Sequence, residues 1–413
     1  MGQRYVPRRG RLNRMRILWV KTDFLHPTDR GGQIRTLETL RQLHANHEVH
    51  YVAYNNPAQP EGLQRAPEYS FRAYPVNRPI PPRGSARFLS QLARNILSPL
   101  PLAVGRYASR QMRDQVQSLV STLRFDSVVC DFLSVAPNIP DLSRSVLFQH
   151  NVETVIWRRH AEHAGSPLRR AYFRLQADRM FRYERTACQA AAHIIAVSEN
   201  DAAQMKQLFG VSRISAVSTG VDLDYFARPA HSETGAGIVF VGAMDWMPNI
   251  DGARWFTQEI LPLIRQKRPQ TRLVLAGRSP VPELQAHAAA DPLIEVTGTV
   301  PDIRPYLWNA AVSVVPLRIG GGTRLKIYEA MAAGVPVVST AIGAEGLAVE
   351  DGKTIALADT PALFAERCLE LLASQDRATQ LSSAALAMVA DRFSWAQVGR
   401  QFESILQSAS AVR

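Results

Sequence analysis

The segment PLRIGGGTRLKIYEAMAAGVP, residues 316–336, follows an apolar run at residues 311–315 that is typical of a buried strand. Three glycines come next, and a helical pattern begins directly after them. Glycines let the backbone approach a ligand closely, and the free N–H groups of a helix start attract anions. The segment therefore predicts an α/β fold with an anion site at this turn.

The charges at this turn favour an anionic ligand. Thr323 is a suitable N-cap, which places Arg324 and Lys326 in the first helical turn. A cation there interacts unfavourably with the helix dipole and destabilises the helix by ~0.3–1 kcal/mol. An anion such as a phosphate at the loop would remove this conflict. Glu329 lies on the same face and is suited to accept a hydrogen bond from a sugar hydroxyl. The alternative is a surface pair between Lys326 and Glu329, and the conflict with the dipole makes us prefer the anion site.

The composition is that of a globular protein of two or three domains, with 413 residues, 46% of them hydrophobic and 20% charged. No apolar run is long enough to span a bilayer. The three cysteines are far apart, which excludes a disulfide framework and fits a reducing cytoplasm. Residues 1–14 hold five arginines and no acidic residue, and we expect a basic disordered leader without the apolar core of a secretory signal.

Strand and helix patterns alternate along both halves of the chain. Residues 15–20 predict a strand, a loop containing Gly31 and Gly32 leads into a helical pattern, and residues 49–54 predict the next strand. This βαβ order indicates a doubly wound parallel sheet. A second alternating series follows residues 227–237, whose composition is typical of an interdomain linker.

Basic residues are concentrated in the first half. Residues 1–217 contain 31 basic and 16 acidic residues, whereas the remainder contains 17 and 20. Residues 72–113 contain eight arginines and no acidic residue, and a helical stripe there consists of Phe88, Leu92 and Ile96. Two interpretations remain open: a helix on an anionic membrane surface, or a core-facing helix with a solvated basic side. Aromatic residues do not alternate with these arginines, so we do not expect nucleic acid as the partner.

One histidine lies where α/β proteins place their chemistry. Residues 127–130 and 145–148 predict two further core strands, and His150 and Glu153 follow the second strand directly. Loops at the carboxyl ends of parallel strands carry the binding sites of such folds. His150 is therefore a candidate for substrate contact.

Six short motifs in a fixed order resemble the family 4 glycosyltransferases. They are VSTGVDLDYF at 217–226, VGAM at 241–244, LAG at 275–277, VTGTV at 296–300, EAMAAGVPVV at 329–338 and FSW at 393–395. The resemblance implies the GT-B architecture, with two facing Rossmann-like domains and a C-terminal helix that returns to the first. The expected divisions are a leader (1–14), an acceptor-side domain (15–217), a nucleotide-sugar domain (218–390) and the returning helix (391–413).

The resemblance also implies a donor site. In this chain its members are Gly31, Gly32, Arg278, Val300, Gly320, Gly321, Gly322, Thr323, Arg324, Lys326 and Glu329, with His150, Glu329 and Lys326 as the catalytic candidates. Glu329 matches the family's ribose-binding Glu, but Gly321 stands where the family commonly has another Glu. The loop at residues 244–249 lacks the family's Arg and Lys, so we expect Arg324 and Lys326 to hold the diphosphate instead.

The implied reaction is transfer of a sugar, with retention of configuration, from a UDP- or GDP-sugar to a lipid-linked or cell-envelope acceptor. Asp222 and Asp224 resemble a D-x-D metal motif but lie in the domain junction, so we expect a metal-independent enzyme. Cytoplasmic location is expected, with peripheral attachment to the inner face of the cytoplasmic membrane. The alternatives are a small soluble acceptor, another nucleotide-sugar reaction such as epimerisation, or a binding module without turnover.

Overall fold

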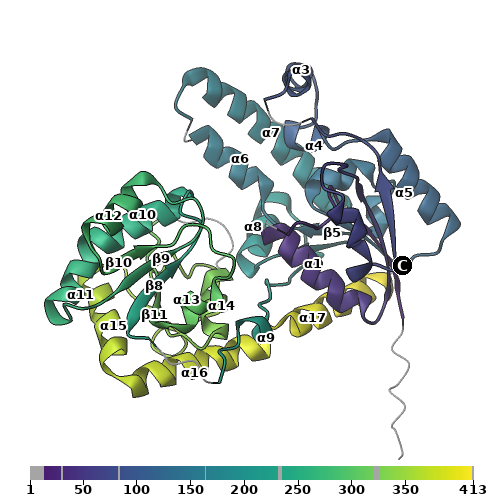
Figure 1. Cartoon of the computed structure of the whole chain (residues 1–413). Coiled ribbons are helices and arrows are strands. Elements are labelled where there is room, and N and C mark those ends of the chain that lie inside the picture. The colour runs from purple at the N-terminus through teal and green to yellow at the C-terminus, as the bar shows by residue number, and fades with distance from the viewer. Residues whose placement is uncertain are drawn as a thin grey trace, which may run out of the picture. The chain divides into compact units, whose positions relative to one another are not determined.

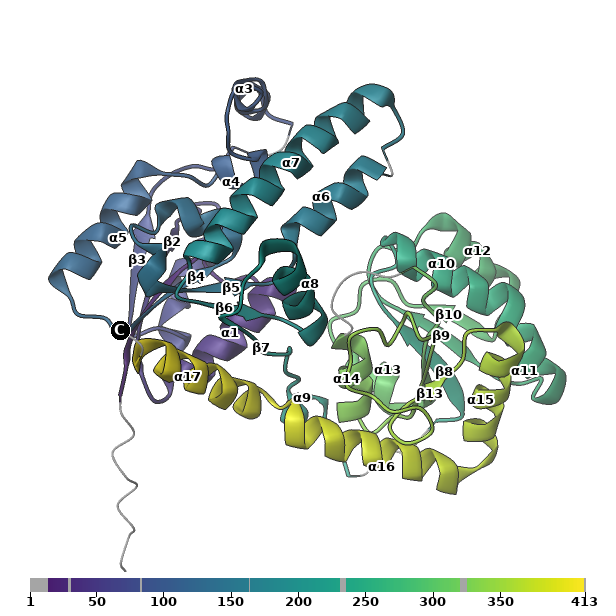
Figure 2. The same cartoon turned by 180° about the vertical axis from the view of Figure 1, so that it is seen from behind.

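The computed structural model describes residues 14–28, 31–81, 84–162, 164–230, 235–319 and 325–411. The chain divides into two compact units (Figures 1 and 2). Unit 1 comprises Met1–Ser218 together with Val398–Arg413, and unit 2 comprises Thr219–Gln397. Each unit is built on one parallel sheet with helices between its strands, which confirms the predicted pair of Rossmann-like domains.

Unit 1 contains a seven-stranded sheet in the order β3-β2-β1-β4-β5-β6-β7, and all of its pairings are parallel. The four central strands are buried along nearly their whole length, as their apolar sequences require. The strands are β1 (Arg16–Val20), β2 (Glu48–Tyr54), β3 (Arg72–Val76), β4 (Ser127–Asp131), β5 (Ser145–Gln149), β6 (His193–Ala196) and β7 (Ile214–Ala216).

The helices of unit 1 connect these strands. Figure 2 shows α6 and α7 as an antiparallel pair that extends from one end of the unit. The helices are α1 (Gly31–His44), α2 (Glu61–Gln64), α3 (Ala86–Asn95), α4 (Leu102–Gly105), α5 (Arg110–Thr122), α6 (Glu153–Glu162), α7 (Pro167–Ala190) and α8 (Glu199–Phe209), with short 3₁₀ turns at Ala66–Glu68, Leu133–Asn138 and Leu142–Arg144.

Unit 2 contains a six-stranded parallel sheet in the order β10-β9-β8-β11-β12-β13. Its strands are β8 (Gly237–Val241), β9 (Leu273–Ala276), β10 (Ile294–Val296), β11 (Ala310–Val315), β12 (Val337–Ser339) and β13 (Ala356–Leu357). Its helices are α9 (Leu223–Phe226), α10 (Met247–Trp255), a π-helical turn (Phe256–Ile260), α11 (Leu261–Lys267), α12 (Pro282–Ala290), α13 (Arg304–Trp308), α14 (Leu325–Ala332), α15 (Pro361–Ala373) and α16 (Gln375–Arg392).

The last helix, α17 (Trp395–Ala411), carries the chain back into unit 1 from Val398 onwards. Within unit 1, the Phe402 ring lies 5.5 Å from Trp19 and 5.1 Å from Phe148, centroid to centroid. Glu403 Oε1 lies 3.2 Å from His47 Nε2. These contacts confirm the predicted return of the C-terminal helix to the first domain.

Two local expectations differ from the structure. Gly31 and Gly32 form the first turn of α1 rather than a loop before it. Residues 227–230, which belong to the predicted linker, lie inside unit 2, because that unit already begins at Thr219.

Asp222 of the D-x-D sequence is the N-cap of α9, where its carboxylate accepts a hydrogen bond from the Tyr225 N–H.

Candidate functional site

A single buried carboxylate organises the carboxyl end of the unit 1 sheet. Asp131, the last residue of β4, is fully buried. Its Oδ2 atom accepts hydrogen bonds from Trp19 Nε1 at 2.9 Å and Lys21 Nζ at 2.9 Å. Thr36 Oγ1 of α1 donates to the same atom at 2.7 Å. Asp131 Oδ1 is 2.7 Å from Nε2 of His150. One residue therefore joins β1, α1 and the loop after β5.

Burial and the hydrogen bond to Asp131 together fix the protonation state of His150. Burial alone raises the pKa of Asp131, but the nearby Lys21 and His150 outweigh it and hold that pKa well below its usual range. Burial lowers the pKa of His150 to about 4, although Asp131 opposes the shift. His150 is therefore neutral at pH 7 and donates through Nε2, because an ionised carboxylate can only accept. Its Nδ1 atom is a buried acceptor with no hydrogen-bond partner among the described residues.

An aromatic ring fixes the orientation of His150. Phe132 has a backbone φ of 76°, which is uncommon for a residue with a side chain. Its ring stacks on the His150 imidazole with 3.8 Å between centroids and 7° between planes. Lys21 Nζ lies 4.2 Å from the centroid of the same ring.

This stack also requires glycine at position 32. A Cβ atom on Gly32 would lie 2.9 Å from Phe132 Cζ and 3.7 Å from His150 Nδ1. The structure thus brings together two of the predicted site residues, Gly32 and His150. Gly31 begins the same helix, whose first turn contains no acidic residue and whose first N–H groups have no partner within the helix.

A second buried carboxylate positions the His150 loop. Glu184 of α7 is fully buried and accepts hydrogen bonds from the N–H groups of Glu153, at 2.9 Å, and Thr154, at 2.7 Å. It also accepts from Thr154 Oγ1 at 2.6 Å and from Gln149 Nε2 at 3.2 Å. Burial raises the pKa of Glu184 to about 7, although these hydrogen bonds oppose the shift. Both ends of the loop are therefore tied to α7.

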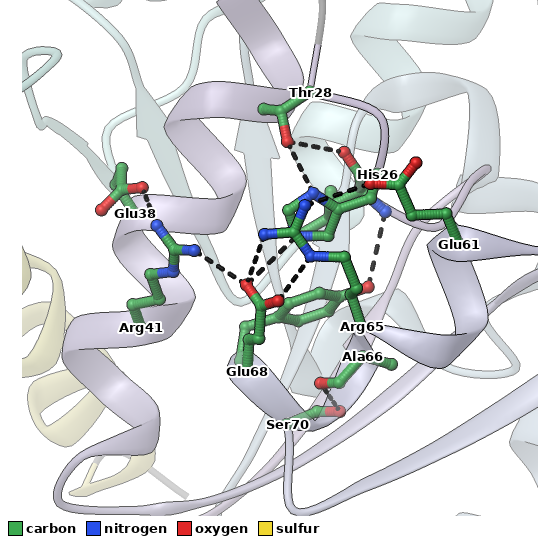
Figure 3. Close-up of polar contacts among 11 residues, drawn as sticks. His26, Thr28, Glu38, Arg41, Glu61, Arg65, Ala66, Glu68 and Ser70 are labelled. Atoms are coloured by element: carbon green, nitrogen blue, oxygen red, sulfur yellow. Dashed lines mark hydrogen bonds and ion pairs between the residues drawn. The ribbon is translucent and has the colours of Figure 1, made fainter.

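An ionic cluster holds the segment that precedes α1 (Figure 3). Glu68 Oε2 is 2.8 Å from Arg41 of α1 and 3.4 Å from His26 Nε2, and Glu68 Oε1 accepts from Arg65 at 2.5 Å. The hydrogen bond from Arg65, followed by the hydrogen bond from Arg41, is the main reason why the pKa of Glu68 falls to about 2. On its other side, the His26 ring is 3.1 Å from Thr28 Oγ1. The chain is thereby anchored at His26, two residues before the described segment ends at Thr28.

The predicted donor-site lysine of unit 2 lies against the loop after β8. Lys326 Nζ donates a hydrogen bond to Asn249 Oδ1 at 2.7 Å and lies 4.9 Å from the centroid of the Phe240 ring. A Cβ atom on Gly242 would lie 2.8 Å from Lys326 Nζ and 2.6 Å from Asn249 Nδ2. Residues 244–249 contain no Arg or Lys, and the Lys326 ammonium occupies the space beside them.

The other predicted residues of unit 2 lie around the same end of the sheet. Glu329 is half-buried one helical turn after Lys326, and burial raises its pKa to about 7 against the opposing effect of Lys326. Arg278 is exposed after β9, and its carbonyl accepts a hydrogen bond from the Met244 N–H at 2.9 Å. Val300 follows β10, and in the described part of unit 2 no hydrogen bond joins it to the other three.

The remaining predicted residues, Gly320, Gly321, Gly322, Thr323 and Arg324, lie outside the described part of the chain. Sequence reasoning missed Trp19, Lys21, Thr36, Asp131, Phe132 and Asn249 as site residues. Lys21 and Asp131 stand at the ends of apolar strand sequences, and the rule that selected His150 applies equally to both of them.

The described residues lack two features, a cluster of metal ligands and a membrane-spanning helix. No group of three or more His, Cys, Asp or Glu side chains there is arranged to hold a metal ion. Among the same residues, no helix has both the length and the hydropathy required to cross a bilayer.

Comparison with known families gives a match on each unit. Residues 30–225 match the Glycosyltransferase Family 4 model, and residues 235–374 match the model of Glycosyl transferases group 1. The chain is a family 4 glycosyltransferase. Among solved structures, this glycosyltransferase resembles a sucrose-phosphate synthase from Thermosynechococcus elongatus, with a TM-score of 0.70, 16% identity and coverage of 97% of this chain and 100% of the other.

The glycosyltransferase also resembles the Anabaena protein Alr3699/HepE in complex with UDP, with a TM-score of 0.66, 14% identity and coverage of 95% and 100%. Among curated proteins, it is 21% identical over 367 residues to an uncharacterised 44.6 kDa protein in the cps region of Klebsiella pneumoniae, covering 86% of this chain and 90% of the relative. It is 31% identical over 94 residues, about a quarter of each chain, to a Xanthomonas campestris GDP-mannose:cellobiosyl-diphosphopolyprenol alpha-mannosyltransferase.

Proposed function

We propose that this glycosyltransferase moves a sugar from a nucleotide-diphosphate sugar to a lipid-linked acceptor of a cell-envelope polysaccharide, with retention of configuration and without a metal ion. The observation that carries the proposal is the Lys326 ammonium, held by Asn249 beside Gly242 at the carboxyl end of β8. A cation fixed next to side-chain-free backbone suits a diphosphate.

Each remaining part of a donor has a matching group. Glu329 is half-buried, and its raised pKa signals a carboxyl group that gains from a hydroxyl partner such as a ribose. The unpartnered Nδ1 atom of His150 is suited to accept a hydrogen bond from a sugar hydroxyl. The names of the relatives support this donor class: Alr3699/HepE was also solved with UDP-glucose, and the Xanthomonas enzyme is named for GDP-mannose.

For retention, we favour attack on the same face of the sugar, assisted by the leaving phosphate, over a covalent intermediate formed on a carboxylate of unit 1. Asp131 lies closest to His150 but already accepts four hydrogen bonds, which makes it a poor nucleophile. Lys326, together with Arg324 on our proposal, neutralises the charge that develops on the diphosphate in place of a metal ion. The capping bond of Asp222 supports a structural role for the D-x-D sequence.

A lipid-linked acceptor is supported by an exposed surface of unit 1. We use the name leucine–arginine surface for the exposed apolar and basic side chains of α3, the two residues after it and the first part of α7, which are Leu89, Ile96, Leu97, Leu168 and Leu175 with Arg87, Arg94, Arg169, Arg170 and Arg174. Leu97 is 90% exposed and Leu168 is 83% exposed. The predicted helical stripe faces the core only in part, because Phe88 and Leu92 are half-buried whereas Ile96 is exposed.

This surface is held rigidly, and its charge suits an anionic membrane. Figures 1 and 2 show α3 next to the α6–α7 pair. Arg179 of α7 donates hydrogen bonds to the carbonyls of Asn95 and Ile96, both at 2.7 Å, so the end of α3 is fixed to α7. Exposed leucines contribute up to about 2–3 kcal/mol each when buried in lipid, and each arginine adds about 1 kcal/mol near an anionic surface.

Vesicle sedimentation tests the acceptor class. The protein should sediment with phosphatidylglycerol-containing vesicles at low salt, detach at high salt and ignore purely zwitterionic vesicles. Serine at both Leu97 and Leu168 should reduce binding at least tenfold, whereas Leu363→Ser, which replaces a less exposed leucine of unit 2, should not. Equal binding by both variants, or no sedimentation at low salt, would favour a small soluble acceptor.

Thermal unfolding with UDP, GDP, ADP and their sugars tests the donor class. A ligand at 100 times its Kd stabilises the folded state by about 2.7 kcal/mol, which gives a measurable shift. At least one UDP or GDP compound should raise the unfolding temperature. No shift with any of the compounds would contradict the donor assignment.

A further inference from the structure

Arg35 of α1 is a buried cation that contacts no acidic side chain in the described part of the chain. Its side chain is 4% exposed, and its Nε atom is sealed from solvent without a hydrogen-bond partner. No other described residue forms a hydrogen bond or ion pair with its guanidinium. Burial lowers the pKa of Arg35 to about 10, so the group is still positively charged at neutral pH. A buried charge without a partner is costly, and proteins retain it where a ligand supplies the partner.

The position of Arg35 places this cation at the site already described. Arg35 comes three residues after Gly32 and directly before Thr36, which donates a hydrogen bond to Asp131. Helical side chains lean toward the start of their helix, so we expect the guanidinium to lie toward the first turn of α1. Its positive charge is one of the causes of the lowered pKa of His150.

In the described part of the chain, neither acidic group that acts on Arg35 forms an ion pair with its guanidinium. Lys21 is matched by Asp131, with which it forms an ion pair at 2.9 Å, and His150 is neutral at pH 7. The other acidic group that acts on Arg35 is Asp201 of α8. Asp201 is half-buried, accepts a hydrogen bond from Ser198 Oγ at 2.6 Å, and forms no ion pair with Arg35. The buried site is therefore suited to an anion.

We propose that Arg35 binds a phosphate group of a substrate at the amino end of α1. The guanidinium presents a planar fork of donors that matches phosphate oxygens, and the free N–H groups of the first helical turn add to the attraction. The inference rests on the proposed function, which offers two sources for this phosphate. One is the diphosphate of the sugar donor, and the other is the diphosphate of a lipid-linked acceptor.

Binding of inorganic pyrophosphate tests the proposal without requiring turnover. Pyrophosphate is titrated into proteins that also carry Lys326→Ala, which removes the phosphate-binding lysine of unit 2. The remaining affinity for pyrophosphate then reports on unit 1. Arg35→Met, which keeps the volume and removes the charge, should weaken pyrophosphate binding about tenfold to a hundredfold, the loss expected for a hydrogen-bonded charge. Arg41→Met is the matched control, because Arg41 lies on the same helix but pairs with Glu38 and Glu68. This control should leave the affinity unchanged.

Thermal unfolding without ligand separates a binding role from a structural one. Removing an uncompensated buried charge should leave the unfolding temperature of Arg35→Met equal to or above that of wild type. If Arg35 instead serves as the partner of Asp201, Arg35→Met and Asp201→Asn should each lower that temperature, and the double variant should lower it no further. That pattern, or unchanged pyrophosphate affinity in Arg35→Met, would overturn the proposal. Should Arg35→Met fail to fold, Arg35→Lys keeps the charge without the fork and should still weaken binding severalfold.

The source of the phosphate follows from two further measurements with Arg35→Met. Weaker binding of UDP or GDP assigns Arg35 to the donor. Unchanged nucleotide binding, with a raised KM for a glycosyl diphosphate polyprenol but not for a neutral alkyl glycoside, assigns it to the acceptor. If no sugar transfer is found at all, the proposed function fails, whereas a difference in pyrophosphate affinity between the Arg35 and Arg41 variants still supports the phosphate site.

Discussion

Replacing Asp131 with Asn tests whether one carboxylate organises the unit 1 site. The substitution keeps the shape of the side chain but leaves the charge of Lys21 buried without its partner, 2.9 Å away. Breaking a buried ion pair on one side costs about 3–5 kcal/mol. For a domain of this size, 1 kcal/mol corresponds to about 2–4 °C, so we expect the unit 1 unfolding temperature to fall by roughly 6–20 °C.

Urea unfolding of the unit 1 transition measures this loss, and its pH dependence identifies the cause. The pKa of folded Asp131 is depressed, so its contribution is fully present above its unfolded pKa of about 3.9 and is lost as the pH falls below that value. The gap between wild type and Asp131→Asn should therefore be constant from pH 5 to 8 and should close in acid.

Asp114→Asn provides the matched control for this measurement. Asp114 forms an exposed pair with Arg110 at 3.8 Å, and removing such a pair changes stability by less than about 1 kcal/mol. A loss in Asp131→Asn no larger than the loss in Asp114→Asn would refute the network.

The remaining predictions concern both units. Gly32→Ala places a methyl group against the Phe132 ring and should lower kcat/KM at least tenfold while costing about 1–3 kcal/mol of stability, whereas Gly165→Ala, which has open space around it, should change neither. Because the folded pKa of Glu184 is raised to about 7, the free energy of unfolding of the wild type should fall by roughly 3 kcal/mol between pH 4.5 and 7, relative to that of Glu184→Gln. A difference between the two proteins that does not change with pH in urea titrations would contradict this assignment. Lys326→Ala should abolish donor binding in calorimetric titrations, and unchanged nucleotide affinity would refute its role.

The fold was predictable where a strand is long and apolar. The central strands β1, β4 and β5 are buried on both faces, and their continuous hydrophobic sequences indicate this. Sequence reasoning missed β3, because it is an edge strand with a weak pattern that includes Pro75, which an edge tolerates. It also missed β12 and β13, which are only three and two residues long.

The site was predictable only in part, because its members come from distant positions. His150 and Lys326 were identified from the loop or helix in which each lies. Lys21 and Asp131 are 110 residues apart, and the parallel pairing of β1 with β4 brings them into contact. That pairing depends on the order of strands in the sheet, which no local pattern determines. The stack of Phe132 on His150 likewise depends on an unusual backbone conformation at Phe132 that its sequence does not indicate.

The most direct test of the account is to follow a radiolabelled sugar from its nucleotide donor. The protein is incubated with labelled UDP- or GDP-sugars and glycosyl diphosphate polyprenols in phosphatidylglycerol vesicles, and the lipid product is analysed by NMR. We expect label in the lipid fraction, with the anomeric configuration of the donor, even in the presence of a chelator. An inverted configuration would contradict retention, and label found only in free sugar or an epimerised nucleotide sugar would contradict glycosyl transfer to a lipid.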